Sequence, residues 1–296
     1  MRARWGPRAG RVLGRVIDGA SWCGARLPAR VAHALAIFGG LAEWTLRPGL
    51  RELLATNLSR AIGKPADSHE VRRLVRRELV NEGRRSADLL WAIGKPDELL
   101  ATLDVVGGEH AKAAAARGKG VVLAGTHTGG WEVVAAAPAR VVPVPTTVLV
   151  ADNWLAWAMQ HIRTTAGLRI AYRSNGALAL VRILQRREAL LVLGDDAWGG
   201  ATDVQTVEFC GTPARLPSGV VTLSRLAQAP IVTFSVLPLG RRRWRIVLDP
   251  PIEPPERRDD EQRVMQQVAD RWSAVIAANP EHWASRFEIA WQDDKP

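Results

Sequence analysis

From about residue 100 onward, short runs of apolar and β-branched residues alternate with stretches of helical periodicity. The apolar runs are Leu103–Val106, Val121–Ala124, Val141–Val150, Leu168–Tyr172, Ala189–Leu193, Val204–Phe209, Ile231–Leu237 and Trp244–Leu248. The helix-like segments lie near 109–117, 131–137, 153–166, 174–187 and 215–228. Strands that alternate with helices build βαβ units with parallel strands. The pattern therefore predicts an α/β fold with a largely parallel central sheet flanked by helices.

The region before residue 100 has a different periodicity. Residues 27–62 and 68–93 have apolar residues at helical spacing, and Ser68 is the expected N-cap of the second segment. At the other end, apolar residues repeat every four positions from Val264 to Ile276, and Asn279-Pro280 should end that helix. We expect a single α/β domain over residues 27–296, with a helical N-terminal layer over 27–95.

Residues 1–26 form a separate basic segment. The first thirty residues hold seven arginines and one acid, and Arg4, Arg8, Arg11 and Arg15 share one stripe of a helical wheel beside Trp5. This pattern is typical of a basic helix that lies in a membrane interface. A frayed basic tail is an alternative, because the glycines in the segment disfavour a helix in water.

The charge balance indicates a polyanionic partner. Lys and Arg number 40 against 30 Asp and Glu, a formal net charge of +10, which suits nucleic acid or an anionic membrane. Twelve tryptophans against one tyrosine favour the membrane, and we recognise no nucleic-acid-binding motif. No apolar segment reaches the ~18–20 residues of a membrane span, so we expect a soluble or peripheral protein. Two cysteines form no disulfide framework, which fits a reducing compartment.

Several common catalytic signatures are missing. The chain has no Gly-x-x-x-x-Gly-Lys-Ser/Thr phosphate loop, no Gly-x-Gly-x-x-Gly dinucleotide motif, no Gly-x-Ser-x-Gly elbow and no His-Glu-x-x-His zinc motif. The chain therefore lacks the residues that usually carry out ATP hydrolysis, classical dehydrogenation, serine hydrolysis or zinc proteolysis. We expect no metal and no resident cofactor.

The segment from Val121 to Glu132 is the strongest candidate site. A buried strand should lead into a loop with His127, followed by Gly129, Gly130 and the first turn of a helix with Glu132. The glycines would let the chain fold back so that the Glu132 carboxylate reaches the imidazole. It would then set the tautomer of His127 and leave the other ring nitrogen as a general base. The carboxyl end of a strand is also where open α/β sheets bind ligands.

The motif around His127 resembles the His-x4-Asp/Glu motif of glycerolipid acyltransferases. It is especially similar to the H-x-G-N-W-E/D form of bacterial lipid A lauroyl/myristoyl acyltransferases and phosphatidylinositol mannoside acyltransferases. Further blocks match in the same order over residues 27–290. They are Ala171-Tyr172-Arg173, Leu193-Gly194-Asp195-Asp196, Phe209-Cys210-Gly211-Thr212-Pro213-Ala214, Pro217-Ser218-Gly219, Ala229-Pro230-Ile231 and Asn279-Pro280-Glu281-His282-Trp283.

The resemblance implies a glycerolipid acyltransferase-like fold and a direct acyl transfer. His127 would deprotonate a hydroxyl of a lipid or glycolipid acceptor, which attacks the thioester of acyl-CoA or acyl carrier protein, while Glu132 stabilises the imidazolium. Arg173 or the amides of Gly129 and Gly130 would bind the oxyanion.

The remaining assignments have alternatives. Arg173 is either a phosphate ligand or a surface residue, and Trp131 either covers the site or packs its helix on the sheet. Asp195 and Asp196 either line the pocket or cap a helix. Cys210 is expected to be a packing residue rather than a nucleophile. We expect the protein at the cytoplasmic face of the cell membrane. Its charge indicates an anionic membrane surface as the partner, and the missing binding motif argues against nucleic acid.

This chain also departs from the family pattern. Gly130 stands where the family has Asn, Asp196 where it has Gln or Arg, and Cys210 where it has a second Phe. These departures leave the acceptor open. The alternatives are a non-catalytic basic lipid-binding or accessory protein and acyl transfer in the tailoring of a secondary metabolite.

Overall fold

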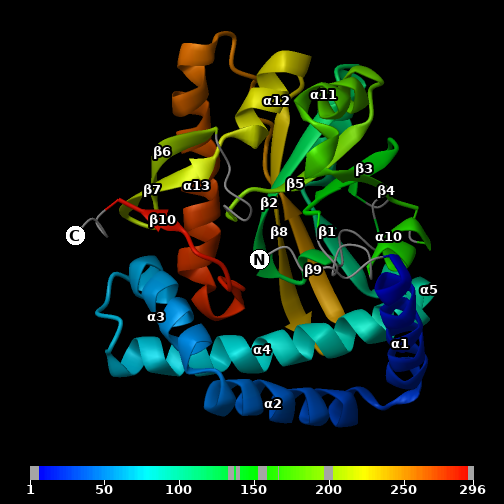
Figure 1. The fold of residues 1–296 in the computed structure, drawn as a ribbon. Coiled ribbons are helices and arrows are strands. Elements are labelled where there is room, and N and C mark those ends of the chain that lie inside the picture. The colour runs from blue at the N-terminus through cyan, green and yellow to red at the C-terminus, as the bar shows by residue number, and fades with distance from the viewer. Residues whose placement is uncertain are drawn as a thin grey trace.

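A seven-stranded sheet in the order β1-β9-β8-β2-β5-β3-β4 forms the centre of the computed structural model (Figure 1). The structure describes residues 7–132, 137, 141–152, 159–165, 167–196 and 203–292. The strands are β1 Leu103–Val106, β2 Val121–Gly129, β3 Thr146–Val150, β4 Arg169–Tyr172, β5 Ala189–Leu193, β8 Ile231–Gly240 and β9 Arg243–Leu248. All neighbouring strands are parallel except β8 and β9, which form a hairpin. The predicted α/β class with a largely parallel sheet is confirmed.

The two faces of the sheet carry separate apolar cores. Along β2, Val122 and Ala124 belong to one buried cluster, whereas Val121 and Leu123 belong to the other. Successive side chains of a strand point to opposite faces, so a strand that is apolar at every position has to be covered on both sides. This accounts for the uninterrupted apolar runs of the sequence.

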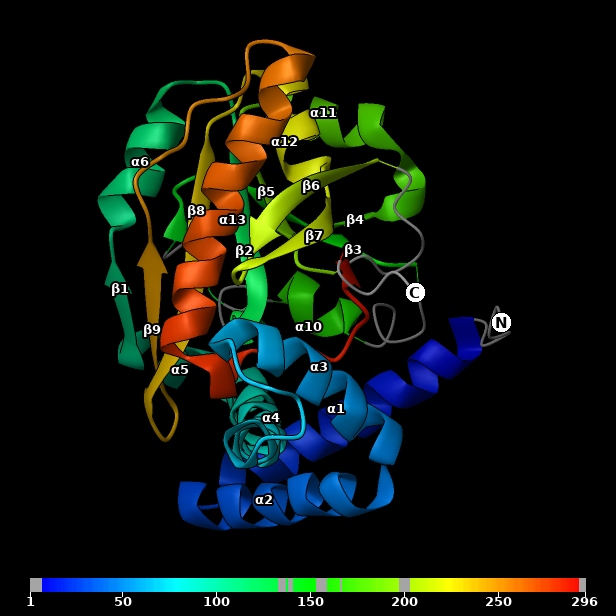
Figure 2. The same cartoon turned by 90° about the vertical axis from the view of Figure 1, so that its left-hand side faces the viewer.

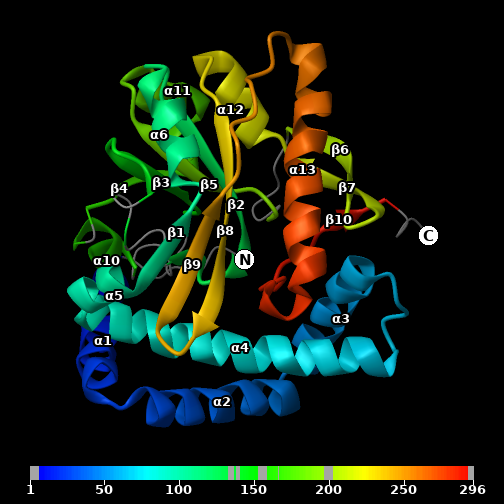
Figure 3. The same ribbon diagram turned by 180° about the vertical axis from the view of Figure 1, so that it is seen from behind.

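Helices cover both faces of the sheet (Figures 2 and 3). On the face of Val121 lies α6, and on the face of Val122 lie α11, α12 and α13. The bounds are α6 Gly108–Ala116, α10 Gln160–Thr165, α11 Ala177–Gln185, α12 Gly219–Ala227 and α13 Glu261–Ala278, with short 3-10 turns at Arg173–Asn175, Arg258–Asp260 and Pro280–His282. As predicted, α13 ends at Asn279-Pro280.

The N-terminal helices form a layer across the end of the sheet where β2 and β8 finish and β9 begins (Figure 1). They are α1 Pro7–Arg26, α2 Ala29–Leu46, α3 Pro48–Ile62, α4 His69–Gly94 and α5 Pro96–Thr102. Helix α4 lies against the sheet end and α2 lies outside it (Figure 2). The Ser68 hydroxyl accepts a hydrogen bond from the Val71 N–H at 3.2 Å, so the predicted N-cap is confirmed. None of the described helices is long and apolar enough to cross a membrane.

Helix α1 forms although its glycines disfavour a helix in water. Small residues on α1 and α4 let the two helices pack closely, and this packing stabilises α1. A Cβ on Gly94 of α4 would lie 2.6 Å from the Ala25 Cβ and 3.0 Å from the Ser21 oxygen. A Cβ on Gly24 would likewise crowd Leu90. The two helices therefore approach closely, and packing stabilises α1 where intrinsic propensity does not.

Several predicted boundaries are wrong. The apolar run Val141–Val150 forms a strand only from Thr146 onward, as β3. Strand β2 continues through His127 to Gly129, so the histidine lies on the strand rather than in a loop. The predicted helix at 215–228 begins only at Gly219. Ahead of it lies β7, Thr212–Pro217, which pairs with β6, Val204–Phe209, and β10, Ala290–Trp291, in a three-stranded antiparallel sheet. Burial alternates along β7, which is the signature of a strand. Parts of the predicted helices at 131–137 and 153–166 lie outside the described residues.

Gly194, directly after β5, lets the chain pack closely against β2 and Trp272. Its N–H donates to the Gly125 oxygen at 3.0 Å, and an added Cβ would overlap the Trp272 ring. We expect Gly194→Ala to lower the free energy of unfolding by about 1–3 kcal/mol, the usual cost of overpacking. Urea unfolding measures this. The control Gly19→Ala has open space around its Cβ on an exposed helix face and should not destabilise the protein. Equal stability of both variants would contradict the packing.

Candidate active site

His127 is held by a buried aspartate on the neighbouring strand end. Its Nδ1 lies 2.8 Å from the Oδ1 of Asp195, which follows β5. The other carboxylate oxygen of Asp195, Oδ2, accepts the His127 backbone N–H at 3.0 Å and the Trp283 indole N–H at 2.9 Å. Asp195 has no exposed surface. Three hydrogen bonds therefore fix this carboxylate, and through it the ring.

These contacts determine which ring nitrogen is available for chemistry. A carboxylate that accepts two N–H groups offers only lone pairs, so we assign the proton of the neutral ring to Nδ1 of His127. Nε2 is then the basic nitrogen. The His127 side chain keeps 20% of its surface exposed and lines a cavity. Burial opposes the charged ring, but the charge and hydrogen bond of Asp195 raise the pKa of His127.

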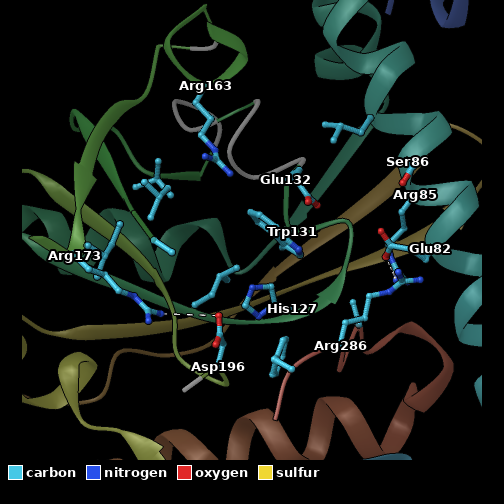
Figure 4. Close-up of a pocket in the computed structure, with 18 residues that line it drawn as sticks. Glu82, Arg85, Ser86, His127, Trp131, Glu132, Arg163, Arg173, Asp196 and Arg286 are labelled. Carbon is cyan, nitrogen blue, oxygen red and sulfur yellow. Dashed lines mark hydrogen bonds and ion pairs between the residues drawn. The ribbon is translucent and has the colours of Figure 1, made fainter. Parts of the chain in front are cut away.

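Glu132 does not make the contact expected of it. Among the described residues, the side chain that hydrogen-bonds the His127 ring is Asp195. Because β2 stays extended to Gly129, the chain does not fold back as the glycine pair suggested. Glu132 lines the same cavity, and Trp131 is seen between it and His127 (Figure 4). Burial and the nearby Glu82 raise the pKa of Glu132 to about 7.

The glycine pair has a packing role. Gly129 has a φ of 62°, and a Cβ there would overlap the Val236 oxygen. The Gly130 N–H donates to the same oxygen at 3.2 Å. Neither glycine lines the cavity. The expected oxyanion donor at Gly130 is therefore committed to strand β8, and the pair instead lets β2 lie close to that strand.

The cavity beside His127 has a volume of about 310 Å³ and a strongly charged wall (Figure 4). Trp131, Arg173 and Asp196 line it. Arg173 and Asp196 form an ion pair at 4.0 Å. Asp195, in contrast, lies behind the ring and orients it, so the two consecutive acids have different positions and roles.

Helix α4 supplies a buried ion network on one side of the cavity. The Arg85 Nη2 lies 3.0 Å from a Glu78 oxygen and also pairs with Glu82. Arg286 lies 2.9 Å from Glu43. Burial raises the pKa of Glu78 to about 7. Sequence reasoning missed this network, because charged residues on an amphipathic helix are indistinguishable from a solvated face without the partner segments.

The C-terminal segment closes the site behind His127. The Ala284 N–H donates to the His127 oxygen at 2.8 Å, and Thr128 forms a β-bridge with Trp283. The Phe287 ring centroid lies 4.9 Å from that of His127. The Pro-Glu-x-Trp block of the sequence indicated that this segment belongs to the site, because its tryptophan, Trp283, donates a hydrogen bond to Asp195.

Two further features adjoin the site. A second cavity of about 660 Å³ lies among α1, α2 and α4; Ala, Gly and Leu form much of its wall, and it shares Glu82, Ser86 and Arg286 with the first. Cys210 is partly buried, and burial raises the pKa of its thiol to about 12. A thiol with such a pKa is a poor nucleophile, consistent with a packing residue. The described residues contain no metal-binding cluster of histidine, cysteine or acidic side chains.

Comparisons with known proteins point to one family. A family model described as bacterial lipid A biosynthesis acyltransferase matches residues 17–285. A phosphatidylinositol mannoside acyltransferase of Mycolicibacterium smegmatis is 27% identical over 284 residues, which cover 91% of this chain and 90% of the relative. A crystal structure of the 1-acyl-sn-glycerophosphate acyltransferase PlsC from Thermotoga maritima matches 84% of this chain and 99% of that one, with 10% identity and a TM-score of 0.39. That likeness is too low to carry an argument.

The contact with Asp195 predicts the titration of His127. We expect the pKa of His127 to lie above the ordinary histidine value, and Asp195→Asn to lower it because the negative charge is lost. NMR of isotopically labelled histidine, with the His127 signal assigned by His127→Gln, measures both values. The control Asp67→Asn, an exposed acid elsewhere, should leave the His127 titration unchanged. An unshifted His127 in Asp195→Asn would contradict the pairing.

Proposed function

This chain belongs to the bacterial lipid A biosynthesis acyltransferase family and is an acyltransferase, and from that premise we propose that it acylates a hydroxyl of a membrane lipid or glycolipid by general-base catalysis at His127. The observation that carries the proposal is that Asp195 holds the imidazole of His127 at Nδ1 while His127 lines the cavity. The donor is a fatty acyl thioester, either acyl-CoA or acyl carrier protein.

The proposed reaction needs no covalent enzyme intermediate. Nε2 of His127 takes the proton of the acceptor hydroxyl as its oxygen attacks the thioester carbonyl. The tetrahedral intermediate then expels the thiolate, which takes that proton from the imidazolium. An ester bond forms, a thioester bond breaks, and His127 returns to its starting state. Asp195 stabilises the imidazolium by a charge-assisted hydrogen bond.

Two other residues of the cavity have proposed electrostatic roles. Glu132 favours the charged form of His127 without hydrogen-bonding it, so its contribution should be smaller than that of Asp195. Arg173 remains the candidate oxyanion donor, since it lines the cavity and the Gly130 amide is engaged elsewhere. The apolar second cavity offers room for an acyl chain next to the site.

The acceptor is proposed to be a lipid that the protein meets at an anionic membrane surface. Seven of the eleven exposed large apolar side chains reported for the described residues lie on α1 and α2. They are Val12, Val16, Trp22, Val31, Leu35, Phe38 and Leu46. Those of α2 recur at helical spacing on one stripe. Their helix lies outermost in the N-terminal layer (Figure 2), and the formal charge of +10 favours anionic lipid. Attachment at the cytoplasmic face, with no nucleic-acid partner, is part of this proposal.

Turnover by a His127 variant tests the catalytic proposal. With palmitoyl-CoA and phosphatidylinositol mannoside, His127→Ala should lower kcat about 10²–10⁴-fold, the usual contribution of a general base. Asp195→Asn should lower kcat more than Glu132→Gln does, because Asp195 hydrogen-bonds the His127 ring and Glu132 does not. Thiol release and mass spectrometry of the lipid measure this, with the exposed His69→Ala as control. Full activity in His127→Ala would remove the proposed base. Vesicle binding by a wild-type protein that releases no thiol would indicate a non-catalytic lipid-binding protein.

A pair of matched surface variants tests the membrane proposal. Phe38 on α2 is 75% exposed and Leu178 on α11 is 74% exposed, so replacing either by Asp should not disturb folding. We expect Phe38→Asp to weaken binding to phosphatidylglycerol-containing vesicles about tenfold or more, because it removes apolar area and adds a repelled charge. Leu178→Asp should bind like the wild type. Vesicle co-sedimentation measures both, and equal loss in the two variants would argue against an α2 surface.

A further inference from the structure

Arg163 is a buried cation at the active-site cavity that the catalytic proposal does not use. It lies on α10, exposes 7% of its surface and lines the cavity with His127. Figure 4 shows its guanidinium directed toward the part of the cavity that Trp131 and Glu132 line. Its Nη1 has no hydrogen-bond partner among the described residues. A buried guanidinium with an unused donor is costly unless a ligand completes it.

The other arginines of the cavity are already compensated by protein carboxylates. Arg85 pairs with Glu78 and Glu82, Arg286 with Glu43, and Arg173 with Asp196. No ion pair of the described residues includes Arg163. Burial lowers its pKa, and Glu132 opposes this by its charge without forming a bond. The positive charge of the cavity is therefore left uncompensated at Arg163.

We propose that Arg163 binds a phosphate group of a substrate inside the active-site cavity, and so positions that substrate for reaction at His127. The inference rests on the proposed function for its catalytic readout. A planar guanidinium matches a phosphate by two parallel N–H···O bonds. The phosphate belongs either to the headgroup of the lipid acceptor or to the phosphorylated part of the thioester donor, and both present the same chemistry to the arginine.

A ligand site and a structural arginine predict opposite effects on stability. Arg163→Gln removes a desolvated charge and breaks no described hydrogen bond, so the melting temperature of the ligand-free protein should not fall. A structural arginine would leave its partners unpaired and lower it. A fall in melting temperature comparable to that of Gly194→Ala would therefore count against the ligand role.

Paired substrates identify the source of the phosphate. If it is the acceptor's, Arg163→Gln should lower kcat/KM about tenfold or more for phosphatidylinositol mannoside, and leave a mannosyl diacylglycerol without phosphate unaffected. If it is the donor's, the same loss should occur with acyl-CoA and be absent with acyl-pantetheine, which has no phosphate. Arg163→Lys should recover only part of either loss. Arg182→Gln, an exposed arginine of α11, is the matched control.

Binding without turnover separates this inference from the proposed function. Isothermal titration calorimetry with coenzyme A and with glycerol 3-phosphate measures this binding directly. We expect at least one of these probes to bind the wild type and His127→Ala, and to bind Arg163→Gln about tenfold more weakly. If the wild type proves inactive, this titration still tests Arg163. Equal affinities in wild type and Arg163→Gln for both probes, together with equal losses for phosphorylated and phosphate-free substrates, would overturn the proposal.

Discussion

The site depends on one fully buried carboxylate. Asp195 accepts hydrogen bonds from the His127 ring, the His127 backbone and the Trp283 indole. These donors come from β2 and from the C-terminal segment, which are more than a hundred and fifty residues apart in the sequence. A buried carboxylate is tolerated only when donors surround it. The three hydrogen bonds that stabilise the buried Asp195 carboxylate therefore also join the end of β2, the His127 ring and the C-terminal segment.

The parallel sheet explains why Asp195 and His127 meet. Neighbouring strands β2 and β5 run in register, with Gly125 opposite Leu193. Residues just beyond that pair fall at the same carboxyl edge of the sheet, where α/β folds place their ligands. Gly194 keeps the chain close to Trp272 at this point. The histidine and the aspartate are thus brought together by strand register rather than by a local motif.

The sequence predicted the sheet and the helical layer, because each leaves a local pattern. Apolar runs marked β1 and β5 at their observed bounds, and Ser68 marked the start of α4. The acid that orients His127 was misassigned to Glu132, because local spacing says nothing about which strands are neighbours. Arg163 was missed for a similar reason. A single arginine in a predicted helix carries no sign of burial, and its meaning comes only from the cavity that distant strands and helices enclose.

The charges that line the cavity are balanced on one side and unbalanced on the other. On the side of α4, Arg85 and Arg286 are neutralised by Glu78, Glu82 and Glu43, so that wall is polar but nearly balanced. Toward α10 the balance is lost, because Arg163 forms no ion pair with a carboxylate of the described residues and its Nη1 has no hydrogen-bond partner among them. An anionic group entering the cavity is therefore drawn to the α10 side. A substrate held there by its charge would keep its reacting end near Nε2 of His127, and orientation of this kind lowers the barrier to acyl transfer without additional chemical groups.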